Sequence, residues 1–413
     1  MKKRAVLWAI TLVLLVGLMA SLWPKPAEAA PVRWRFQSIW VPSITLWKGD
    51  KYWVDLMNVM AAGDLDIKWF AGGTLVTRSD EMFDAVAKGT IEAGTDWPSY
   101  WEGKNSAFGL ITSTPVWLTP GDYMIWFWQA GGLELAQELY SKYGIVWFPH
   151  SVTGPESGQR SNKPIKTGDD YKGVKMRQCG RVQAKVLQDL GGAAIFMPGS
   201  EIYLALSRGT IDAAEFSVPG VDWSMGFQEV TKFWVLPGWH QPGPVSGVMI
   251  NKAAWDKAPD RVKFLAKEAA MASMMWAWTF YELNAADFTQ KFKEKGIQTS
   301  ILDQDAINKI TDIAYKYLIE DAEANPDHAK IAFSQAKYLK DFAEWRSIEQ
   351  PFMFGRNPPK LDQIYAKLEE IAKKHKVYDA VIESQKASRA RMEAQEFWKP
   401  GTPYVGNPVA PPK

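Results

Sequence analysis

The hydrophobic pattern of the first third of the chain alternates between strand-like and helix-like spacing. Trp47 to Met60 carries apolar residues at helical spacing, and a second, short helix is expected over residues 80–87, closed by Gly89. Apolar stretches typical of strands lie at residues 33–40, 66–70 and 91–95. Because helices and strands alternate in this way, the pattern predicts an α/β domain.

The unit that joins a helix to a strand recurs later in the chain. The segment 84–93 is echoed by the segment 203–213, and each contains a helix end, a glycine (Gly89 or Gly209) and a strand entered through isoleucine. A common turn that recurs by chance is the alternative, but the length of the match favours a duplicated lobe. Two α/β lobes would enclose a cleft, and ligands of open α/β sheets bind at the carboxyl ends of the strands.

Beyond Pro259 the pattern becomes helical, with expected helices at residues 261–295, 303–323 and 327–346. The first of them contains a bulky apolar run from Met271 to Tyr281. Such helices pack either on the lobes of their own chain or on a second subunit. The apolar content predicts a homodimer through these helices, with packing on the chain's own lobes as the alternative.

The N-terminal segment has the pattern of an export signal. Basic residues at positions 2–4 precede an apolar run at 5–23, and the small-residue site Ala-Glu-Ala follows at 27–29. This order predicts a signal peptide cleaved after Ala29, and an uncleaved membrane anchor is the alternative. No cysteine stands near this site, so a lipid anchor is not supported.

Composition narrows the class of protein. With 48 Lys and Arg against 46 Asp and Glu, the chain lacks the basic excess that nucleic-acid binders carry. Loss of residues 1–29 removes four basic side chains and one acidic one, which takes the net charge from +2 to −1. The single cysteine, Cys179, excludes an intrachain disulfide and is interpreted as a buried filler. The 21 tryptophans are expected mainly in the core, with a minority in a ligand cavity.

Motifs of common enzyme classes are absent from the sequence. There is no His-Glu-x-x-His, no Gly-x-Ser-x-Gly, no P-loop and no Gly-x-Gly-x-x-Gly. The four histidines do not occur at metal-ligand spacing, which argues against a zinc or iron site built on histidine. The sequence therefore favours a binding protein over an enzyme.

Three charged residues stand where strands give way to loops. Glu156 lies in a turn-rich segment after a strand at 145–148, Glu215 ends the repeated strand, and Arg177 ends a strand that begins at Val174. Each of these charges alone is typical of a solvated loop. An arginine at the end of an apolar strand is also a suitable clamp for a carboxylate, because its donors form a planar fork.

Several motifs in order carry a resemblance to a known family. The chain resembles the solute receptors of tripartite ATP-independent periplasmic (TRAP) transporters, and in particular the branch that binds 2-oxo and 2-hydroxy acids. The resemblance covers the chain from about Arg33 to the long helices. The motifs are Lys172-Gly-Val-Lys-Met-Arg177, Leu190-Gly-Gly, Pro198-Gly-Ser-Glu-Ile, Leu206-Ser-Arg-Gly-Thr-Ile-Asp-Ala213 and Pro237-Gly-Trp-His-Gln-Pro-Gly243.

The resemblance implies a bilobal periplasmic binding protein with two α/β lobes, crossing strands, a long spanning helix and no catalytic role. Its partners would be a small organic acid and the membrane permease subunits of the transporter, and relatives of this branch can dimerise through swapped C-terminal helices. The expected division is a signal peptide at 1–29, lobe I at 30–152, lobe II at 153–241, a return to lobe I with the long spanning and C-terminal helices at 242–350, a C-terminal helical extension at 351–398 and a disordered tail at 399–413.

The resemblance also assigns roles within the site. Arg177 matches the arginine that pairs with the substrate carboxylate, and Glu215 with the backbone of Phe216 matches metal-binding positions. Glu156 stands where the keto-acid receptors carry a glutamine. Two glutamates and a substrate carboxylate against one arginine leave a double positive charge to be supplied, which favours calcium, with sodium as the alternative. A Glu156 that points to solvent or pairs with Arg160 is the competing interpretation.

One histidine and several aromatic side chains are the candidates for contact with the substrate in the cleft. Candidate substrate contacts are the loop residue His240 and the aromatic residues Trp40, Trp97, Tyr100, Phe216 and Trp239. A structural role in its proline-bounded loop is the default for His240. The competing function is a periplasmic enzyme that uses Glu156 and Glu215 as an acid/base pair. A chaperone or sensor partner without a small ligand is a third class.

Overall fold

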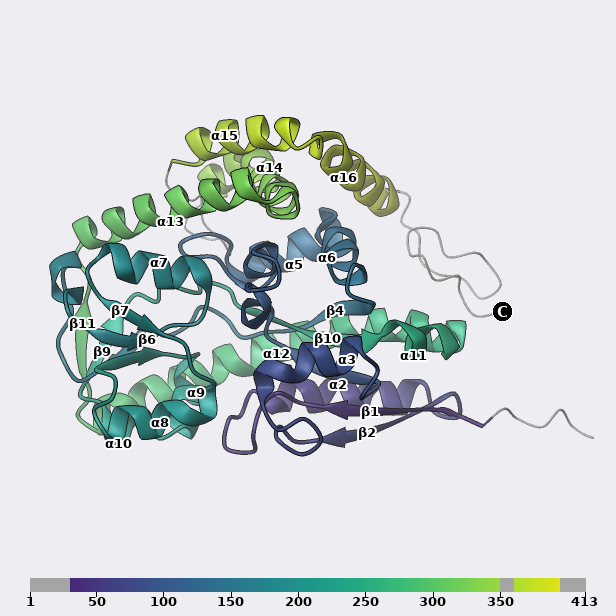
Figure 1. Ribbon diagram of the computed structural model, residues 1–413, viewed down its shortest axis with the longest axis horizontal. Helices are drawn as coiled ribbons and strands as arrows, with labels where there is room; N and C mark the ends of the chain where they lie inside the picture. The colour runs from purple at the N-terminus through teal and green to yellow at the C-terminus, as the bar shows by residue number, and fades with distance from the viewer. Residues whose placement is uncertain (1–29, 350–359, 394–413) are drawn as a thin grey trace, which may run out of the picture.

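The computed structural model describes residues 30–349 and 360–393, and it consists of two α/β lobes, each built on its own sheet (Figure 1). This is the mixed α/β bilobal fold that the sequence predicts. The predicted signal peptide at 1–29 and the predicted tail at 399–413 lie outside the described residues.

The first lobe holds a five-stranded sheet of order β2-β1-β3-β10-β4. Strand β1 pairs in parallel with β2 and β3, while β10 runs antiparallel to both β3 and β4. In β1 the side chains of Trp34 and Phe36 are buried and those of Arg33 and Arg35 are exposed, as expected for a strand with one face in the core. The strands are β1 (Val32–Gln37), β2 (Leu65–Phe70), β3 (Ala93–Asp96), β4 (Ile145–Val152) and β10 (Val245–Asn251).

Helices cover this sheet, and the longest of them at the start of the chain has the bounds that the sequence predicts, Trp47 to Met60. Helix α5 begins at a capping box in which Thr119 and Asp122 satisfy each other's backbone N–H groups. The helices are α2 (Trp47–Met60), α3 (Met82–Ala87), α4 (Ala107–Thr112), α5 (Pro120–Gln129), α6 (Gly132–Ser141) and α11 (Lys252–Lys257).

The second lobe holds a six-stranded sheet of order β11-β9-β5-β8-β6-β7. Strand β6 lies between β7 and β8 and is parallel to both, and β5 is antiparallel to β8 and β9. The strands are β5 (Gln159–Ser161), β6 (Lys175–Arg177), β7 (Ala193–Ile195), β8 (Ala213–Glu215), β9 (Phe233–Leu236) and β11 (Gln298–Ile301). The helices are α7 (Arg181–Asp189), α8 (Gly199–Ser207), α9 (Pro219–Ser224) and α10 (Phe227–Val230).

The sequence repeat corresponds to the same structural unit in each lobe. Helix α3 leads through Gly89 (φ 72°) to β3, and α8 leads through Gly209 (φ 67°) to β8. Both glycines occupy the left-handed conformation that ends a helix at low steric cost. In each copy the threonine after the glycine donates its N–H to a carbonyl of the last helical turn, that of Ala85 or Ala205. The two copies therefore end their helices by the same mechanism.

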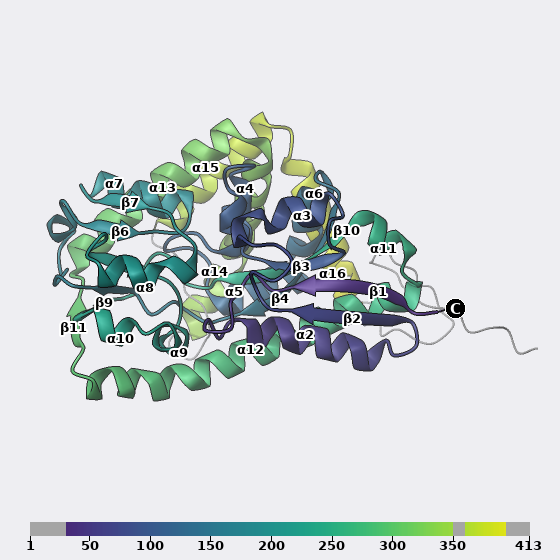
Figure 2. The same cartoon turned by 60° about the horizontal axis from the view of Figure 1, so that its bottom comes forward.

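Within the described residues, three segments lead from a strand of one sheet to a strand of the other. The chain crosses at residues 153–158, between β4 and β5, and crosses back at 237–244, between β9 and β10. The third connection is α12 (Asp260–Glu294), a helix of 35 residues that runs along both lobes (Figure 2). It packs on β4 and α2 of the first lobe and on α9 of the second.

The C-terminal helices cover one side of both lobes, along the top of Figure 1. Helix α13 packs on α7 of the second lobe, and α14 packs on α4 and α6 of the first. The expected return to lobe I at 242–350 contributes β10 to the first sheet, but β11 from the same range joins the second sheet. The helices are α13 (Gln304–Ala324), α14 (Pro326–Glu349), α15 (Leu361–Lys374) and α16 (Tyr378–Glu393).

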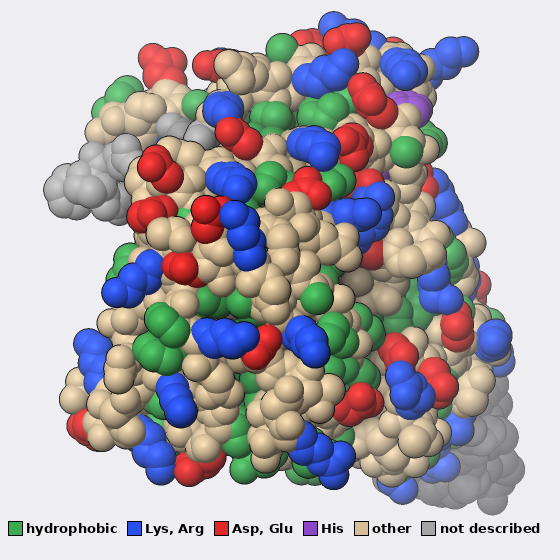
Figure 3. All heavy atoms as spheres, turned by 60° about the vertical axis from the view of Figure 1, so that its left-hand side comes forward, with side chains coloured by type: hydrophobic (Ala, Val, Ile, Leu, Met, Phe, Trp, Pro, Cys, Tyr) green, Lys and Arg blue, Asp and Glu red, His purple; other side chains and the backbone are tan. Residues whose placement is uncertain are grey.

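Many of the largest buried side chains are tryptophans, as their abundance in the sequence predicts. Six tryptophans are among the largest fully buried side chains: Trp34, Trp53, Trp101, Trp117, Trp126 and Trp147. On the face over the second lobe, basic and acidic side chains are interspersed, in keeping with the near-zero net charge (Figure 3). Across residues 30–349 and 360–393, no helix is both long and apolar enough to cross a membrane.

Candidate solute- and metal-binding site

Arg177 and Glu215 meet at the carboxyl ends of two neighbouring strands of the second sheet. They end the neighbouring parallel strands β6 and β8, so the carboxyl ends of both strands lie side by side. Nη1 of Arg177 lies 2.8 Å from Oε1 of Glu215 and also donates to the Glu215 carbonyl oxygen at 3.1 Å. The backbone N–H of Cys179 donates to the same Oε1. The Glu215 carboxylate is therefore held on one side only, through Oε1.

Glu156 comes to the same place on the crossing segment 153–158. Its backbone N–H donates to the carbonyl of Gln241 at 3.1 Å, which ties the two crossing segments together. The close approach requires Gly238, because a Cβ there would lie 2.0 Å from the Glu156 carbonyl oxygen. The Glu156 side chain is only 2% exposed, and Arg160 pairs with Asp222 instead. The interpretation in which Glu156 points to solvent or pairs with Arg160 is therefore wrong.

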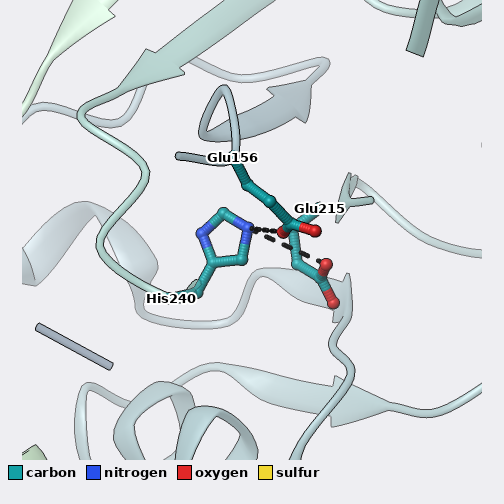
Figure 4. Close-up of side chains that lie close together, drawn as sticks. All are labelled: Glu156, Glu215 and His240. Carbon is teal, nitrogen blue, oxygen red and sulfur yellow. Dashed lines mark ion pairs between the residues drawn. The ribbon is translucent and has the colours of Figure 1, made fainter. Parts of the chain in front are cut away.

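Glu156, Glu215 and His240 form a buried cluster whose side chains converge from three segments (Figure 4). Nε2 of His240 lies 2.8 Å from Oε2 of Glu156 and 3.8 Å from Oε2 of Glu215. The shorter contact is within hydrogen-bond distance, but its angles are not those of a hydrogen bond. Within the described residues, these atoms have no hydrogen-bond partner although they are fully buried.

Burial sets the charge states of this cluster. It raises the pKa of Glu156 well above the ordinary value, helped by repulsion from Glu215 and Asp222, and it also raises the pKa of Glu215 against the attraction of Arg177. Burial lowers the pKa of His240 to about 3, so its imidazole is neutral. Burial alone would lower the pKa of Arg177, but the nearby Glu215 raises it, so the guanidinium stays charged.

This arrangement fits a bound cation. One ligand atom from each of Glu156, Glu215 and His240 lies within 4.8 Å of the others, and carboxylate oxygens without other partners are suitable ligands for a hard ion. A neutral imidazole also has a lone pair to offer. Two buried carboxylates at such short range repel each other unless a cation or a proton lies between them. The cluster is therefore a candidate metal site.

A small cavity lies beside the cluster, with a volume of only about 10 Å³, which is room for about one water molecule. Among the predicted contacts, Trp40, Trp97, Tyr100, Arg177 and Phe216 line it, whereas Trp239 and His240 do not. The Trp239 indole N–H donates instead to the Tyr171 hydroxyl at 3.1 Å, and His240 turns to the carboxylates. The wall residues that sequence reasoning did not place there are Leu46, Cys179 and Gln241.

The cavity combines apolar walls with one fixed charge. Trp40 packs edge-on against Trp97 at 5.6 Å and against Phe216 at 6.1 Å between ring centroids. The Phe216 ring is seated by Gly199, where a Cβ would lie 2.5 Å from a ring carbon. Arg177 supplies the positive charge at this wall. Such a cavity suits a compact ligand with a carboxylate and a short carbon chain.

The sequence matches the bacterial extracellular solute-binding protein family 7 (DctP) over residues 36–321. The chain belongs to this family. It is therefore a TRAP solute-binding protein and not an enzyme, so the alternative of an acid/base pair at Glu156 and Glu215 is not supported. A curated relative, the monocarboxylate 2-oxoacid-binding periplasmic protein of a Nostoc species, is 30% identical over 319 residues, which cover 77% of this chain and 87% of the relative.

Solved structures of TRAP solute-binding proteins resemble the model. One from Bordetella bronchiseptica, a mixed-occupancy dimer with calcium and picolinate in one active site and an apo site, has a TM-score of 0.74 at 27% identity, covering 86% of this chain and 100% of that one. Two more, each 28% identical, cover 77% of this chain and 97% of their own. That of Pseudoalteromonas atlantica binds sodium and pyruvate (TM-score 0.73), and that of Colwellia psychrerythraea binds calcium and pyruvate (TM-score 0.72).

Proposed function

We propose that this TRAP solute-binding protein is exported, captures a small 2-oxo or 2-hydroxy acid together with a metal ion, and delivers the acid to the membrane permease subunits of its transporter. The observation that carries the proposal is the cavity whose wall holds Arg177 beside two buried carboxylates without partners on their open side. Export rests on the signal peptide predicted at residues 1–29.

Arg177 pairs with the carboxylate of the acid in this proposal. Its guanidinium is already oriented by Glu215 and by the Met197 carbonyl, to which Nε donates at 3.2 Å. An arginine held in this way loses little conformational entropy when a carboxylate binds. Trp40, Trp97, Tyr100 and Phe216 enclose the carbon chain, and because the cavity between them is small, the acid is expected to be short and to widen the cavity when it binds.

The cation is held by Glu156, Glu215 and the backbone of Phe216, with calcium favoured and sodium as the alternative. Two glutamates and the acid give three negative charges, and Arg177 compensates one of them. A divalent ion balances the remaining two in a buried site, where uncompensated charge is costly. The relatives support a cation of this kind, since one binds calcium with picolinate, one calcium with pyruvate and one sodium with pyruvate.

Calorimetry on metal-free protein tests the proposal. We expect pyruvate or lactate to bind once calcium is added, and we expect a chelator to remove that binding. Binding that survives in protein shown to be free of metal would overturn the cation while leaving the arginine clamp in place. If neither acid binds with calcium or sodium present, this class of acid is wrong.

We also propose a homodimer through the outer face of α12. Part of the run from Met271 to Tyr281 packs on the chain's own lobes, but Met271 and Met275 remain partly exposed, and Leu283 on the same helix is 73% exposed. The relative from Bordetella bronchiseptica is a dimer. Light scattering at high protein concentration is expected to give twice the chain mass, and a monomer throughout would contradict the proposal.

A further inference from the structure

Two buried glutamines, Gln178 and Gln241, line different spaces. Gln241 lines the cavity beside Arg177, and Gln178 lines an outer hollow whose wall shares only Tyr100 with that of the cavity. Gln241 is 1% exposed and Gln178 is 2% exposed. In the part of the chain that the structure describes, Oε1 of Gln241 and both amide atoms of Gln178 have no hydrogen-bond partner.

Two other polar side chains of the cavity wall, Arg177 and Tyr100, already have protein partners. Arg177 is engaged with Glu215 and the Met197 carbonyl, and the Tyr100 hydroxyl interacts with Arg177. The amide of Gln241 is different, since its oxygen is buried at the cavity without a partner. A buried amide oxygen without a hydrogen bond is unfavourable, so we expect a group of the ligand to form a hydrogen bond with the amide.

The backbone fixes Gln241 relative to the candidate metal site. Its carbonyl accepts the N–H of Glu156 at 3.1 Å, and the side chain of the preceding residue, His240, reaches the same glutamate. Gln241 thus links the cation site to the cavity that Arg177 lines. Because Arg177 and Gln241 line the same small cavity, an acid whose carboxylate pairs with Arg177 would have its C2 atom within reach of the wall that holds Gln241.

We propose that Gln241 is a specificity-determining residue that hydrogen-bonds the oxygen on C2 of the bound acid. The inference rests on the proposed function and adds the group of the acid that the site recognises, the oxygen on C2. A primary amide has one acceptor oxygen and two N–H donors, so it can accept from a 2-hydroxyl or, after a half turn, donate to a 2-oxo group. An acid without a C2 oxygen leaves the amide unpaired and is discriminated against.

The experiment compares three acids of nearly equal size on the mature protein with calcium present: pyruvate, lactate and propionate. For the wild type we expect pyruvate and lactate to bind at least about tenfold more tightly than propionate. In Gln241→Met, which keeps the bulk and removes the amide, we expect this preference to fall about tenfold while propionate binding changes little. The matched control is Gln178→Met, which removes an equally buried amide outside the cavity and is expected to keep the wild-type preference.

The outcomes separate this inference from the proposed function. If the wild type binds none of the three acids, the proposed function fails, and the inference fails with it. If the wild type binds pyruvate and lactate but Gln241→Met retains the full preference over propionate, the proposed function stands and the role of Gln241 is overturned. Gln241→Asn retracts the amide by one methylene group and is expected to act in the same direction, so it serves if the Met variant does not fold.

Discussion

The second lobe contains two buried arginine–carboxylate pairs that differ in how completely they are satisfied. Arg160 pairs with Asp222, with Nε and Oδ2 at 2.9 Å, and Arg177 pairs with Glu215 at 2.8 Å. The four side chains are almost completely buried. Judged by residue type, distance and burial alone, the two pairs are equivalent.

Their surroundings distinguish them. Both oxygens of Asp222 have partners, because Oδ2 accepts from Arg160 and the Ser157 hydroxyl, and Oδ1 accepts from the Ser217 N–H. The guanidinium of Arg160 lies over the rings of Trp234 and Phe292, at 4.2 and 3.7 Å from their centroids. Nη1 of Arg160 has no hydrogen-bond partner among the described residues, but aromatic rings lie against this guanidinium, as expected for a structural ion pair.

The pair of Arg177 and Glu215 is open on one side. Oε2 of Glu215 has no hydrogen-bond partner among the described residues, and Arg177 lines the cavity. Each pair leaves one polar atom without a partner, so we infer the proposed binding role of Arg177 and Glu215 from the space they face, a cavity in place of packed rings. Burial of a charge is common to both roles.

The strongest test of this difference is the loss of each arginine. Arg177→Ala is expected to weaken acid binding by about 3–5 kcal/mol, a factor of roughly 150 to 4,000, because it leaves the ligand carboxylate buried without its charged partner. Calorimetry with pyruvate or lactate in the presence of calcium measures the loss. Arg177→Lys is expected to lose less, since lysine keeps the charge but not the planar fork.

The matched control is Arg160→Lys. It disturbs an equally buried pair and is expected to lower the melting temperature, yet the folded protein should bind the acid with nearly wild-type affinity. Similar losses of affinity in Arg160→Lys and Arg177→Lys would mean that both pairs act only through the stability of the lobe, and the distinction drawn here would be wrong.

Much of the fold was predictable because its signals are local. Helix α2 has the predicted bounds, and the glycines that end α3 and α8 mark two equivalent units. The placement of β11 in the second sheet was not predictable in this way. That strand follows the long α12, and the sheet it joins depends on the direction of the helix across both lobes, which no local pattern records.

The candidate site was predictable where regular strands end. Glu215 and Arg177 follow from their positions at the ends of parallel strands, whose geometry brings them together. The crossing segment 237–244 has no such periodicity. The direction of each side chain there depends on turns and on contacts such as that of Gly238 with the Glu156 carbonyl, so Trp239, predicted to contact the substrate, lies away from the cavity that Gln241 lines.

The second prediction concerns the open side of the cluster and has a smaller effect. Glu156→Gln keeps an oxygen ligand but removes one negative charge, so calcium affinity is expected to fall by about 2 kcal/mol, or roughly 30-fold. Sodium should then support acid binding better than it does in the wild type. Titrations of acid in calcium and in sodium measure the exchange. An unchanged calcium requirement in the variant would show that Glu156 does not contribute charge to the ion.

The last prediction is a pH dependence of stability confined to metal-free protein. Burial and the neighbouring Glu215 raise the pKa of Glu156 well above its ordinary value of 4.5. The folded state therefore holds a proton that the unfolded chain has already released, and the stability of the metal-free protein decreases as pH rises from 4.5 towards the raised pKa. Calcium binds the ionised carboxylates, so protons compete with it.

Thermal unfolding between about pH 5 and about pH 8, with and without calcium, measures this coupling. We expect the melting temperature of metal-free protein to fall over this range and the gain from calcium to grow by a few degrees, since about 1 kcal/mol moves the melting temperature of a large domain by about 2–4 °C. Glu156→Gln removes the titrating group. The difference between the wild type and this variant therefore isolates the contribution of Glu156 from that of all other titrating groups. The increase in melting temperature on adding calcium could instead be the same at both ends of the pH range and in the variant. That result would mean that the cation does not replace a proton at Glu156, and that the site beside Glu215 is closed in solution, like the surroundings of Asp222.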